Sequence, residues 1–276
     1  MDAELERYGS VLDRWHGRPT EAWREAWGVP ALRVYRSVGS TNDVAWTWAE
    51  AGAEEGATVV ADEQTRGRGR RGRVWRSDPG RSLILSMVIR PDSLGAEPVL
   101  SLRLGLAAAR AIEEVAGLAV RVKWPNDLVV DGRKAGGMLC EGMVRSDRPA
   151  FVVAGTGINV LQPDDAWTGE LAGQATSLAA RAGEPVSIPT LAGRVVARWR
   201  AVLDAPADTL TTAELDAFRD RDALAGATVT VDGESAGVVQ GIAPDGALLL
   251  ADARGRARRV RSGTVRAVDT ETGERR

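Results

Sequence analysis

The stretch ATVVADEQTRGRGRRGRVW, residues 57–75, decides how the first half of this chain folds. Its first six residues, ATVVAD, are mostly small or β-branched and predict a strand. Residues 66–73, the Arg/Gly loop, then hold five arginines and three glycines. The apolar run SLILSMVIR, residues 82–90, predicts the next strand. We therefore expect the Arg/Gly loop to connect two strands of a sheet.

The composition of the Arg/Gly loop suits a small anion. Glycine allows a ligand to approach the backbone and permits positive φ angles, and arginine offers forked donors that match phosphate or carboxylate oxygens. A solvated basic turn and an RNA-binding segment are the alternatives, but the flanking strands and the single copy favour an ordered anion-binding loop. Trp75 follows the loop and could stack on a purine. A plain core tryptophan is the alternative, because the chain has nine tryptophans.

Length and composition restrict the class of protein. A chain of 276 residues predicts one large domain and a small one. The net charge is 36 − 38 = −2, whereas nucleic-acid binders usually carry a basic excess. Cys140 is the single cysteine and His16 the single histidine, which excludes an intramolecular disulfide and argues against zinc or Ser–His–Asp catalysis. The acidic N-terminus and the lack of a long apolar run predict a cytoplasmic protein with no membrane partner.

The rest of the chain alternates strands and helices up to about residue 222, after which the pattern changes to short strands only. The first thirty or so residues look helical, and later helices are expected at 41–52, 97–116 and twice within 189–222. Further strands are expected at 32–36, 119–124, 127–144 and 150–160. Four short strands then predict a small β-barrel. The expected division is a helical segment 1–31, a catalytic domain 32–222, a barrel 223–270 and a frayed tail 271–276.

Lys123 is the most informative single residue. It ends an apolar strand in KWPNDL, residues 123–128, where a lysine can point into a cleft as a point charge for phosphate or carboxylate. An exposed lysine is the alternative. The chain contains only one other lysine, Lys134, so arginine supplies all other positive side chains and a lysine at position 123 indicates a chemical requirement.

Two further motifs have both a structural and a functional interpretation. GSTN, residues 39–42, can cap a helix or form a polar nook at a helix N-terminus, and Gln64 adds an amide that donates and accepts. GTGIN, residues 155–159, is either a turn at a strand end or a ligand contact. The chain has no Walker A sequence and no dinucleotide-binding fingerprint in a strand-to-helix context.

Taken in order, these motifs resemble those of the biotin–protein ligases: STN (40–42), EQTRGRGRRGRVW (63–75), KWPNDL (123–128), KAGGMLCE (134–141) and GTGINV (155–160). The resemblance covers about residues 32–270. It implies an α+β fold in which a mixed sheet with helices, like that of class II aminoacyl-tRNA synthetases, precedes an SH3-like β-barrel. It also implies that biotin and ATP form biotinyl-5′-AMP, and that biotin then passes to a lysine of a biotin carboxyl carrier protein, as in acetyl-CoA carboxylase.

The resemblance assigns roles to individual residues. Lys123 and Arg70 would be catalytic, since cations stabilise the charge that develops during phosphoryl transfer. The biotin-binding set would be Ser40, Thr41, Asn42, Gln64, Gly67, Arg68, Gly69, Arg70, Lys123, Gly136 and Gly137. The nucleotide-binding set would be Arg68, Arg71, Trp75, Asn126, Lys134 and Asn159. No residue is expected to bind metal directly, and Mg²⁺ would bridge the ATP phosphates. The Arg/Gly loop would close as a lid that keeps water from the adenylate.

The chain departs from the family pattern at one point, and two other functions fit part of the sequence. Many bacterial members begin with a DNA-binding domain of roughly sixty residues, but about thirty precede VYRSVGSTN here, so we expect no repressor activity and no nucleic-acid partner. A lipoate–protein ligase would share the architecture, but lipoate lacks the ureido group that the polar residues near 40–42 and 64 suit. A binding protein without turnover is disfavoured by the net charge and by Lys123. A sheet edge could pair with the carrier or form a homodimer.

Overall fold

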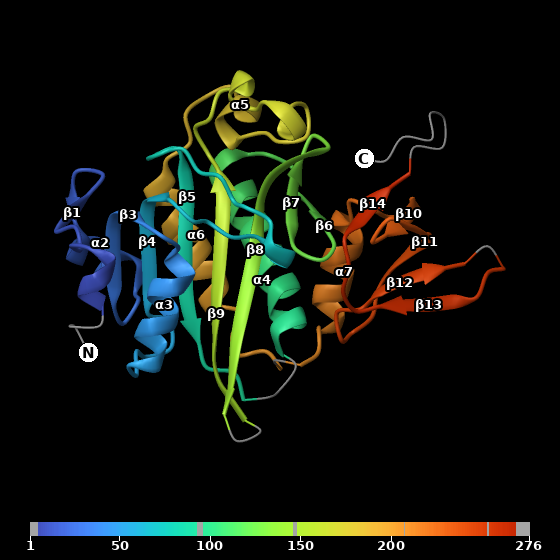
Figure 1. The fold of residues 1–276 in the computed structure, drawn as a ribbon, viewed down its shortest axis with the longest axis horizontal. Coiled ribbons are helices and arrows are strands. Elements are labelled where there is room, and N and C mark those ends of the chain that lie inside the picture. Colours follow the sequence, from blue (N-terminus) through green and yellow to red (C-terminus); the bar gives the residue numbers. More distant parts are fainter. Residues whose placement is uncertain (1–4, 93–95, 146–147, 207, 253, 269–276) are drawn as a thin grey trace.

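A seven-stranded mixed sheet forms the centre of the molecule (Figure 1). The computed structural model describes residues 5–92, 96–145, 148–206, 208–252 and 254–268. The strand order is β3-β4-β5-β9-β8-β7-β6, with β3 and β4 parallel and the other neighbours antiparallel. The strands are β3 Leu32–Val38, β4 Thr58–Gln64, β5 Ser82–Ile89, β6 Arg121–Lys123, β7 Asp127–Val130, β8 Arg133–Arg145 and β9 Arg148–Asn159.

Helices cover the two faces of this sheet unequally. Helices α4 (Ala96–Ala116) and α6 (Ile188–Arg200) lie behind it, and α3 (Thr41–Glu50) lies in front of β4 and β5 (Figure 1). Side chains of β5 alternate accordingly: Leu85 and Met87 join the larger core behind the sheet, whereas Val88 joins the core under α3. Because α3 is short, the front face of β8 and β9 remains available for the Arg/Gly loop.

The N-terminal region is less helical than expected. Residues 1–4 lie outside the described residues, and α2 (Thr20–Trp27) is the one α-helix described before β3. A 3-10 turn (Glu6–Tyr8) and two short strands, β1 (Arg14–Trp15) and β2 (Arg18–Pro19), precede it. His16 and Gly17 both have positive φ, 45° and 79°, which is the geometry of a tight hairpin turn. Within residues 5–31, α2 is therefore the one α-helix of several residues that corresponds to the helical segment expected there.

The other predicted helices are present. The structure confirms the helix expected at 97–116 as α4 and the two helices expected within 189–222 as α6 and α7 (Thr212–Arg221). The short helix α5 (Leu178–Ala182) was not predicted. Within the described residues, no helix combines the length and apolar character that a membrane span requires.

The C-terminal part is a five-stranded antiparallel sheet in the order β13-β12-β11-β10-β14. Its strands are β10 Thr228–Val231, β11 Glu234–Ile242, β12 Leu248–Ala251, β13 Ala257–Val260 and β14 Val265–Ala267. Four of them match the predicted short strands. Strand β13 was missed because Arg258 and Arg259 are exposed at a sheet edge, where no apolar pattern is needed. In the part of the chain that is described, this five-stranded order agrees with the small β domain expected there, and β13 and β14 are its two edge strands. The tail 271–276 lies outside the described residues.

The predicted α+β class is confirmed: a mixed sheet with helices precedes a small β-sheet. The Arg/Gly loop connects β4 to β5, as expected, and crosses in front of the central strands towards the C-terminal sheet (Figure 1). This crossing brings the predicted motifs together on the front face.

Candidate active site

Glycines leave the front face of β8 and β9 without side chains. Gly137 of β8 and Gly157 of β9 lie opposite each other in the register. A Cβ atom at Gly155 would overlap the side-chain amide of Asn42, and one at Gly157 would overlap the indole of Trp75. The missing side chains therefore allow α3 and the segment after the Arg/Gly loop to lie directly on the sheet.

The STN motif forms a buried polar cluster at the start of α3. Ser40 precedes the helix, but its hydroxyl makes no capping hydrogen bond. Instead the side chain of Gln64 caps the helix, because its Oε1 accepts from Thr41 N (2.8 Å) and Thr41 Oγ1 (3.0 Å). Ser86 Oγ of β5 lies 2.8 Å from Thr41 Oγ1 and 2.6 Å from Asn42 Oδ1. The motif thus serves as a polar cluster with residues of β4 and β5.

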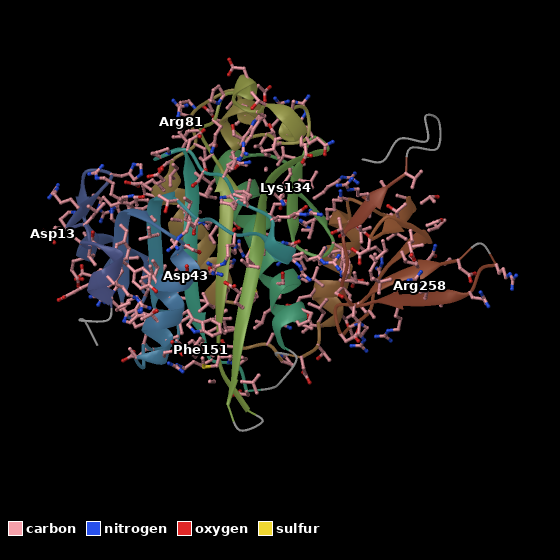
Figure 2. All side chains as sticks on the ribbon, viewed as in Figure 1. Asp13, Asp43, Arg81, Lys134, Phe151 and Arg258 are labelled. Carbon is pink, nitrogen blue, oxygen red and sulfur yellow. The ribbon has the colours of Figure 1, made fainter. Side chains whose placement is uncertain are left out.

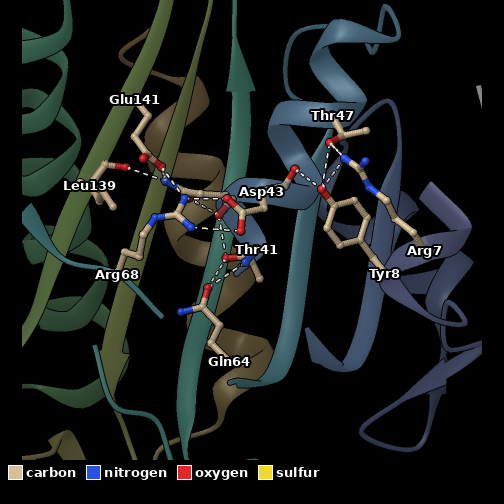
Figure 3. A network of polar contacts seen from close by, with 11 residues as sticks. Arg7, Tyr8, Thr41, Asp43, Thr47, Gln64, Arg68, Leu139 and Glu141 are labelled. Atoms are coloured by element: carbon tan, nitrogen blue, oxygen red, sulfur yellow. Dashed lines mark hydrogen bonds and ion pairs between the residues drawn. The ribbon is translucent and has the colours of Figure 1, made fainter. Parts of the chain in front are cut away.

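Arg68 links the Arg/Gly loop to α3 and β8 (Figure 3). Its two terminal nitrogens donate to the two carboxylate oxygens of Asp43 at 3.0 and 2.7 Å. The second nitrogen also lies 3.4 Å from Glu141 Oε2. The hydrogen bond with Asp43 is the main cause that raises the pKa of Arg68 above its ordinary value. Among the described residues Arg68 therefore binds two carboxylates of the protein itself.

Other loop arginines contact the C-terminal sheet. Arg71 forms an ion pair with Asp232, and Arg73 donates to Thr264 Oγ1 at 2.9 Å. The side chain of Arg70 has no hydrogen bond or ion pair with any residue that the structure describes. The loop is therefore ordered by its own arginines, and Arg70 remains free to meet a ligand.

The three glycines of the loop have different reasons to be there. Gly67 is crowded: a Cβ would lie 2.6 Å from the main-chain oxygen of Trp75 and 2.8 Å from Gln64 Nε2. Gly72 has a φ of 74°, and Arg71 before it has 57°, which together form the tight turn at the tip of the loop. Gly69 has a φ of −113° and meets neither condition.

Lys123 lies at the end of β6 without a partner. No hydrogen bond or ion pair to its amine occurs within the described part of the chain. Burial lowers the pKa of Lys123, the charge of Asp127 opposes this, and Lys134, Arg266 and Arg73 lower it further. Lys134, by contrast, has its Nζ 2.5 Å from Asp127 Oδ1. The two lysines of the chain are thus neighbours, and one of them is free.

The remaining predicted residues surround the same part of the sheet. Asn126 Nδ2 donates to the main-chain oxygen of Met138 at 2.6 Å and holds the turn after β6 against β8. Gly136 also packs against β9, because a Cβ there would lie 2.8 Å from Gly157 O. Figure 2 labels Asp43 in α3 and Lys134 at the start of β8, and the candidate site lies on the front face between them.

Two buried polar atoms on this face have no protein partner. Asn159 Nδ2 donates to Thr176 O at 3.0 Å, but its Oδ1 is unpaired, and so is Trp75 Nε1. Asn159 follows Gly157, which lies under Trp75, by two residues and so shares its face of β9. An unpaired buried polar atom costs about 1–3 kcal/mol. One donor and one acceptor are therefore available to a ligand at this end of the site.

Two cavities lie near these elements. One of about 450 Å³ opens beside α3 and is lined by Arg7, Tyr8, Ser37, Val38, Gly39, Asp43, Thr65 and Arg66. The other, of about 710 Å³, lies between α2 and α6 and contains none of the predicted residues. Neither includes Lys123 or Trp75.

Sequence reasoning missed the acidic partners of the site. Asp43 directly follows STN and Glu141 ends KAGGMLCE, so both stood next to recognised motifs. Ser86 lies in an ordinary apolar strand, and no sequence signal marks it. Among the described residues no three His, Cys, Asp or Glu side chains gather as metal ligands.

Comparison with known proteins gives a consistent result. Residues 34–159 match the sequence profile described as the biotin/lipoate A/B protein ligase family. The chain is 43% identical over 155 residues to the bifunctional ligase/repressor BirA of Bacillus subtilis, covering 55% of this chain and 48% of that protein. It is 34% identical over 221 residues to the biotin–[acetyl-CoA-carboxylase] ligase of Paracoccus denitrificans, covering 74% and 88%. The chain thus spans about half the length of the Bacillus protein and most of the Paracoccus protein.

Solved structures of biotin protein ligases resemble this chain in fold. The biotin protein ligase of Aquifex aeolicus in complex with biotin and ATP superposes with a TM-score of 0.71 at 26% identity, covering 86% of this chain and 99% of that one. The biotin protein ligase of Leishmania major in complex with biotinyl-5-AMP superposes with a TM-score of 0.59 at 26% identity, covering 84% and 98%.

Proposed function

Since the chain belongs to the biotin/lipoate A/B protein ligase family, we propose that it is an ATP-dependent biotin–[biotin carboxyl-carrier protein] ligase. Biotin would react with ATP to give biotinyl-5′-AMP and pyrophosphate, and a carrier lysine would then take the biotinyl group. The observation that carries the proposal is the partly buried amine of Lys123, which has no partner among the described residues and lies near Arg73 of the Arg/Gly loop, in the sheet against which the polar STN cluster packs. The similar Aquifex and Leishmania proteins, which hold biotin with ATP and biotinyl-5-AMP, support it.

The hydrogen-bonding capacity of the STN cluster favours a ureido ring. That ring has one carbonyl acceptor and two N–H donors. Within the described residues, Ser40 Oγ and Gln64 Nε2 have no partner and can donate to the carbonyl. Asn42 Oδ1 and Thr41 Oγ1 both lie within hydrogen-bond distance of Ser86 Oγ, whose single proton can reach only one of them at a time, so each keeps a lone pair for a ring N–H. A lipoyl ring would leave these groups unpaired, which disfavours it.

The first step joins two anions. A biotin carboxylate oxygen attacks the α-phosphorus of ATP, a new P–O bond forms, and pyrophosphate leaves with the electron pair of the broken bond. Arg70 and Lys123 would screen the approach and stabilise the charge on the phosphate oxygens, which is the main contribution proteins make to this chemistry. Lys123 suits this role because it is held without an ion-pair partner. Trp75 and Asn159 would hold the base through their unpaired atoms, with Asn126, Lys134 and Arg71 near the nucleotide.

The second step releases AMP. The neutral amine of the carrier lysine attacks the acyl carbon, the C–O bond to phosphate breaks, and the amine proton passes to water. The mixed anhydride must survive until the carrier arrives. The Arg/Gly loop, which lies across the sheet and is tied at Arg68 and Arg71, would keep water away from it.

Magnesium would reach the site with the nucleotide. Asp127, which lies near both lysines, already pairs with Lys134, and the described acidic residues form no cluster of three. ATP phosphates and water would therefore hold Mg²⁺. When bound, it would neutralise phosphate charge.

Adenylate formation tests the function. Purified protein is mixed with biotin, α-labelled ATP and Mg²⁺, with lipoate in place of biotin as the control. We expect a labelled adenylate with biotin alone. An adenylate with lipoate alone would move the protein to the sister activity, and none with either acid would overturn the ligase proposal.

A further inference from the structure

We propose that Asp43 and Glu141 form a carboxylate clamp that positions Arg68, and through it the Arg/Gly loop, for the substrate. The inference rests on the proposed function, because it concerns the side of the site where biotin would bind. Both acids are positioning residues, since they act through Arg68 and Asn42 and touch no substrate.

The clamp joins three elements that are distant in the sequence. Asp43 lies in the first turn of α3, Arg68 in the loop and Glu141 on β8 (Figure 3). Asp43 receives two hydrogen bonds from Arg68, at 2.7 and 3.0 Å, in the end-on geometry that fixes the plane of a guanidinium. Glu141 lies 3.4 Å from the same guanidinium. These contacts fix both the position and the orientation of Arg68.

Glu141 has a second contact that an ordinary surface ion pair would lack. Its Oε2 accepts a hydrogen bond from Asn42 Nδ2 at 2.6 Å. Asn42 is buried, and Leu139 O accepts from the same Nδ2 at 3.3 Å. One carboxylate therefore orients two side chains of the predicted biotin set, Asn42 and Arg68. This arrangement leaves Asn42 Oδ1 directed to Ser86 and the front of the sheet.

The N-terminal segment holds Asp43 from the other side. Tyr8 Oη lies 3.2 Å from the main-chain oxygen of Asp43 and 2.9 Å from Thr47 Oγ1 (Figure 3). Arg7 donates to Thr47 Oγ1 at 2.9 Å. Tyr8 and Arg7 precede residues 34–159, which match the family profile. A segment that lies before the profile match thus supports the helix turn that carries the clamp.

The negative charge of Asp43 and Glu141 indicates that these acids position Arg68 and do not bind substrate themselves. Two carboxylates around one guanidinium leave a net negative charge beside a site for anionic substrates, which opposes their binding. The arrangement is useful only if the fixed geometry of Arg68 outweighs that repulsion. Arg68 keeps donors for this purpose, because no described residue accepts from its Nε. Its side chain is 39% exposed, so a ligand can reach it.

The test compares four variants with the wild type. Asp43→Asn and Glu141→Gln remove one charge each with little change in shape, and Asp43→Glu restores a carboxylate. Asp216→Asn is the matched control, since Asp216 pairs with Arg219 (2.7 Å) on α7 and has no contact with the loop. Hydrogen exchange of residues 66–73 is measured without substrate, and kcat and KM for biotin are measured in adenylate formation.

We expect faster exchange of the loop in Asp43→Asn and a KM for biotin raised about two- to fivefold, the range for partly exposed charge pairs, with kcat changed less. Glu141→Gln should also raise KM, because it releases Asn42. Asp43→Glu should recover part of the loss, and Asp216→Asn should match the wild type. A mere loss of folded protein would lower kcat at unchanged KM.

Unchanged loop exchange in both Asp43→Asn and Glu141→Gln would overturn the clamp, as would an unchanged KM despite faster exchange. A wild type that forms no adenylate would overturn the proposed function instead. In that event the exchange data would still decide whether the two acids hold the loop.

Discussion

At the scale of single residues, Lys123 shows a conflict between stability and function. Its amine is partly buried without a partner, and burial with nearby cations lowers its pKa. Removing a charge from water costs free energy unless a partner compensates. The fold therefore tolerates an unfavourable charge at the place where two anionic substrates would meet.

Lys123→Met is expected to stabilise the protein and to inactivate it. The free energy of unfolding at neutral pH should rise on the order of 1 kcal/mol, as when a functional group is removed from a strained site. Adenylate formation should fall about 100-fold or more, as for loss of one charge-stabilising group. Urea unfolding and pyrophosphate release measure the two effects.

The pH dependence of this gain follows from the lowered pKa of Lys123. Below that pKa the lysine is charged in both the folded and the unfolded chain, so the full burial cost is present. As pH rises towards the ordinary lysine value the cost disappears, and the stabilisation by Lys123→Met should shrink. Lys134→Met removes an ion-paired lysine and should bring no gain. A stabilisation that grows with pH would contradict this account.

A site residue could be predicted from the sequence only where its own neighbours in the sequence form the recognisable pattern. Lys123 was recognisable because KWPNDL places it where an apolar strand ends. Asp43 and Glu141 were not, because their shared partner Arg68 lies 25 and 73 positions away. Local patterns reveal which residues carry chemistry, whereas the acids that orient them become visible only when the sheet register is known.

At the scale of elements, the Arg/Gly loop combines fixed arginines with one free arginine. Arg70 next to the tight turn at Arg71 and Gly72 has no partner among the described residues. We expect Arg70→Gly to let biotinyl-AMP escape, because it removes a cation and adds backbone freedom at the same point. Free adenylate would then label lysines of unrelated proteins such as serum albumin.

The controls separate charge from flexibility. Arg70→Ala removes the cation without a glycine, and Arg70→Lys keeps the charge. Escape in Arg70→Gly that exceeds that in Arg70→Ala would attribute part of the effect to loop flexibility. If none of the three variants biotinylated unrelated proteins more than the wild type does, the proposal that the Arg/Gly loop retains the adenylate would be refuted.

The junction of α4 and α7 depends on a buried ion pair. Arg103 is 1% exposed and Glu214 16%, and Arg103 also donates to Thr209 O at 2.8 Å. Burial acts to raise the pKa of Glu214, but hydrogen bonds from Arg103 and Thr211 outweigh it and leave the pKa lowered. Glu214→Gln leaves a buried unpaired charge, which should cost about 3 kcal/mol of unfolding free energy.

Because the pKa of Glu214 is lowered in the folded chain, the pair stabilises the fold above the ordinary glutamate value and ceases to do so as pH falls through the lowered pKa. Urea unfolding at several pH values should therefore show the wild type and Glu214→Gln converging in acid. The double variant Arg103→Met/Glu214→Met should recover much of the loss at neutral pH. A double variant less stable than Glu214→Gln would contradict the ion-pair explanation.

Sequence patterns predicted the elements that bury apolar faces and missed those that do not. Helix α4 and strand β5 have long apolar patterns, and both were predicted close to their bounds. Strand β13 has an arginine-rich edge, and the hairpin of β1 and β2 depends on positive φ at His16, an uncommon conformation for a residue other than glycine. Exposed edges and unusual turns leave little periodic signal.

At the scale of the whole molecule, the Arg/Gly loop joins the two sheets. Arg68 ties it to α3 and β8, and Arg71 and Arg73 tie it to the C-terminal sheet. Arg266 of β14 also lies close enough to Lys123 for its charge to contribute to the lowered pKa of that lysine. The C-terminal sheet thus restrains the Arg/Gly loop through two of its arginines.

Asp232→Asn tests whether the C-terminal sheet holds the loop closed. Asp232 has a φ of 53°, which asparagine tolerates, so the variant removes charge and keeps the turn. Arg71 would lose its ion pair, and we expect faster hydrogen exchange of residues 66–73 and more biotinyl-AMP released before the carrier arrives. The hydrogen bond from Arg71, followed by that from Thr264 N, lowers the pKa of Asp232, so the tie is present above the ordinary aspartate value and is lost only in stronger acid.

If the ion pair of Arg71 and Asp232 holds the loop closed, adenylate retention by the wild type should stay constant between about pH 6 and 9, where Asp232 is charged throughout. Raised salt should reproduce part of the effect of Asp232→Asn, because the pair is half exposed and screened by ions. Asp252→Asn is the control, since Asp252 pairs with Arg256 (2.8 Å) within the C-terminal sheet and does not contact the loop. If Asp232→Asn instead lowered the KM for ATP and left retention unchanged, Asp232 would be a competitor of the nucleotide for Arg71. The C-terminal sheet would then restrain one arginine, and the loop would close without its help.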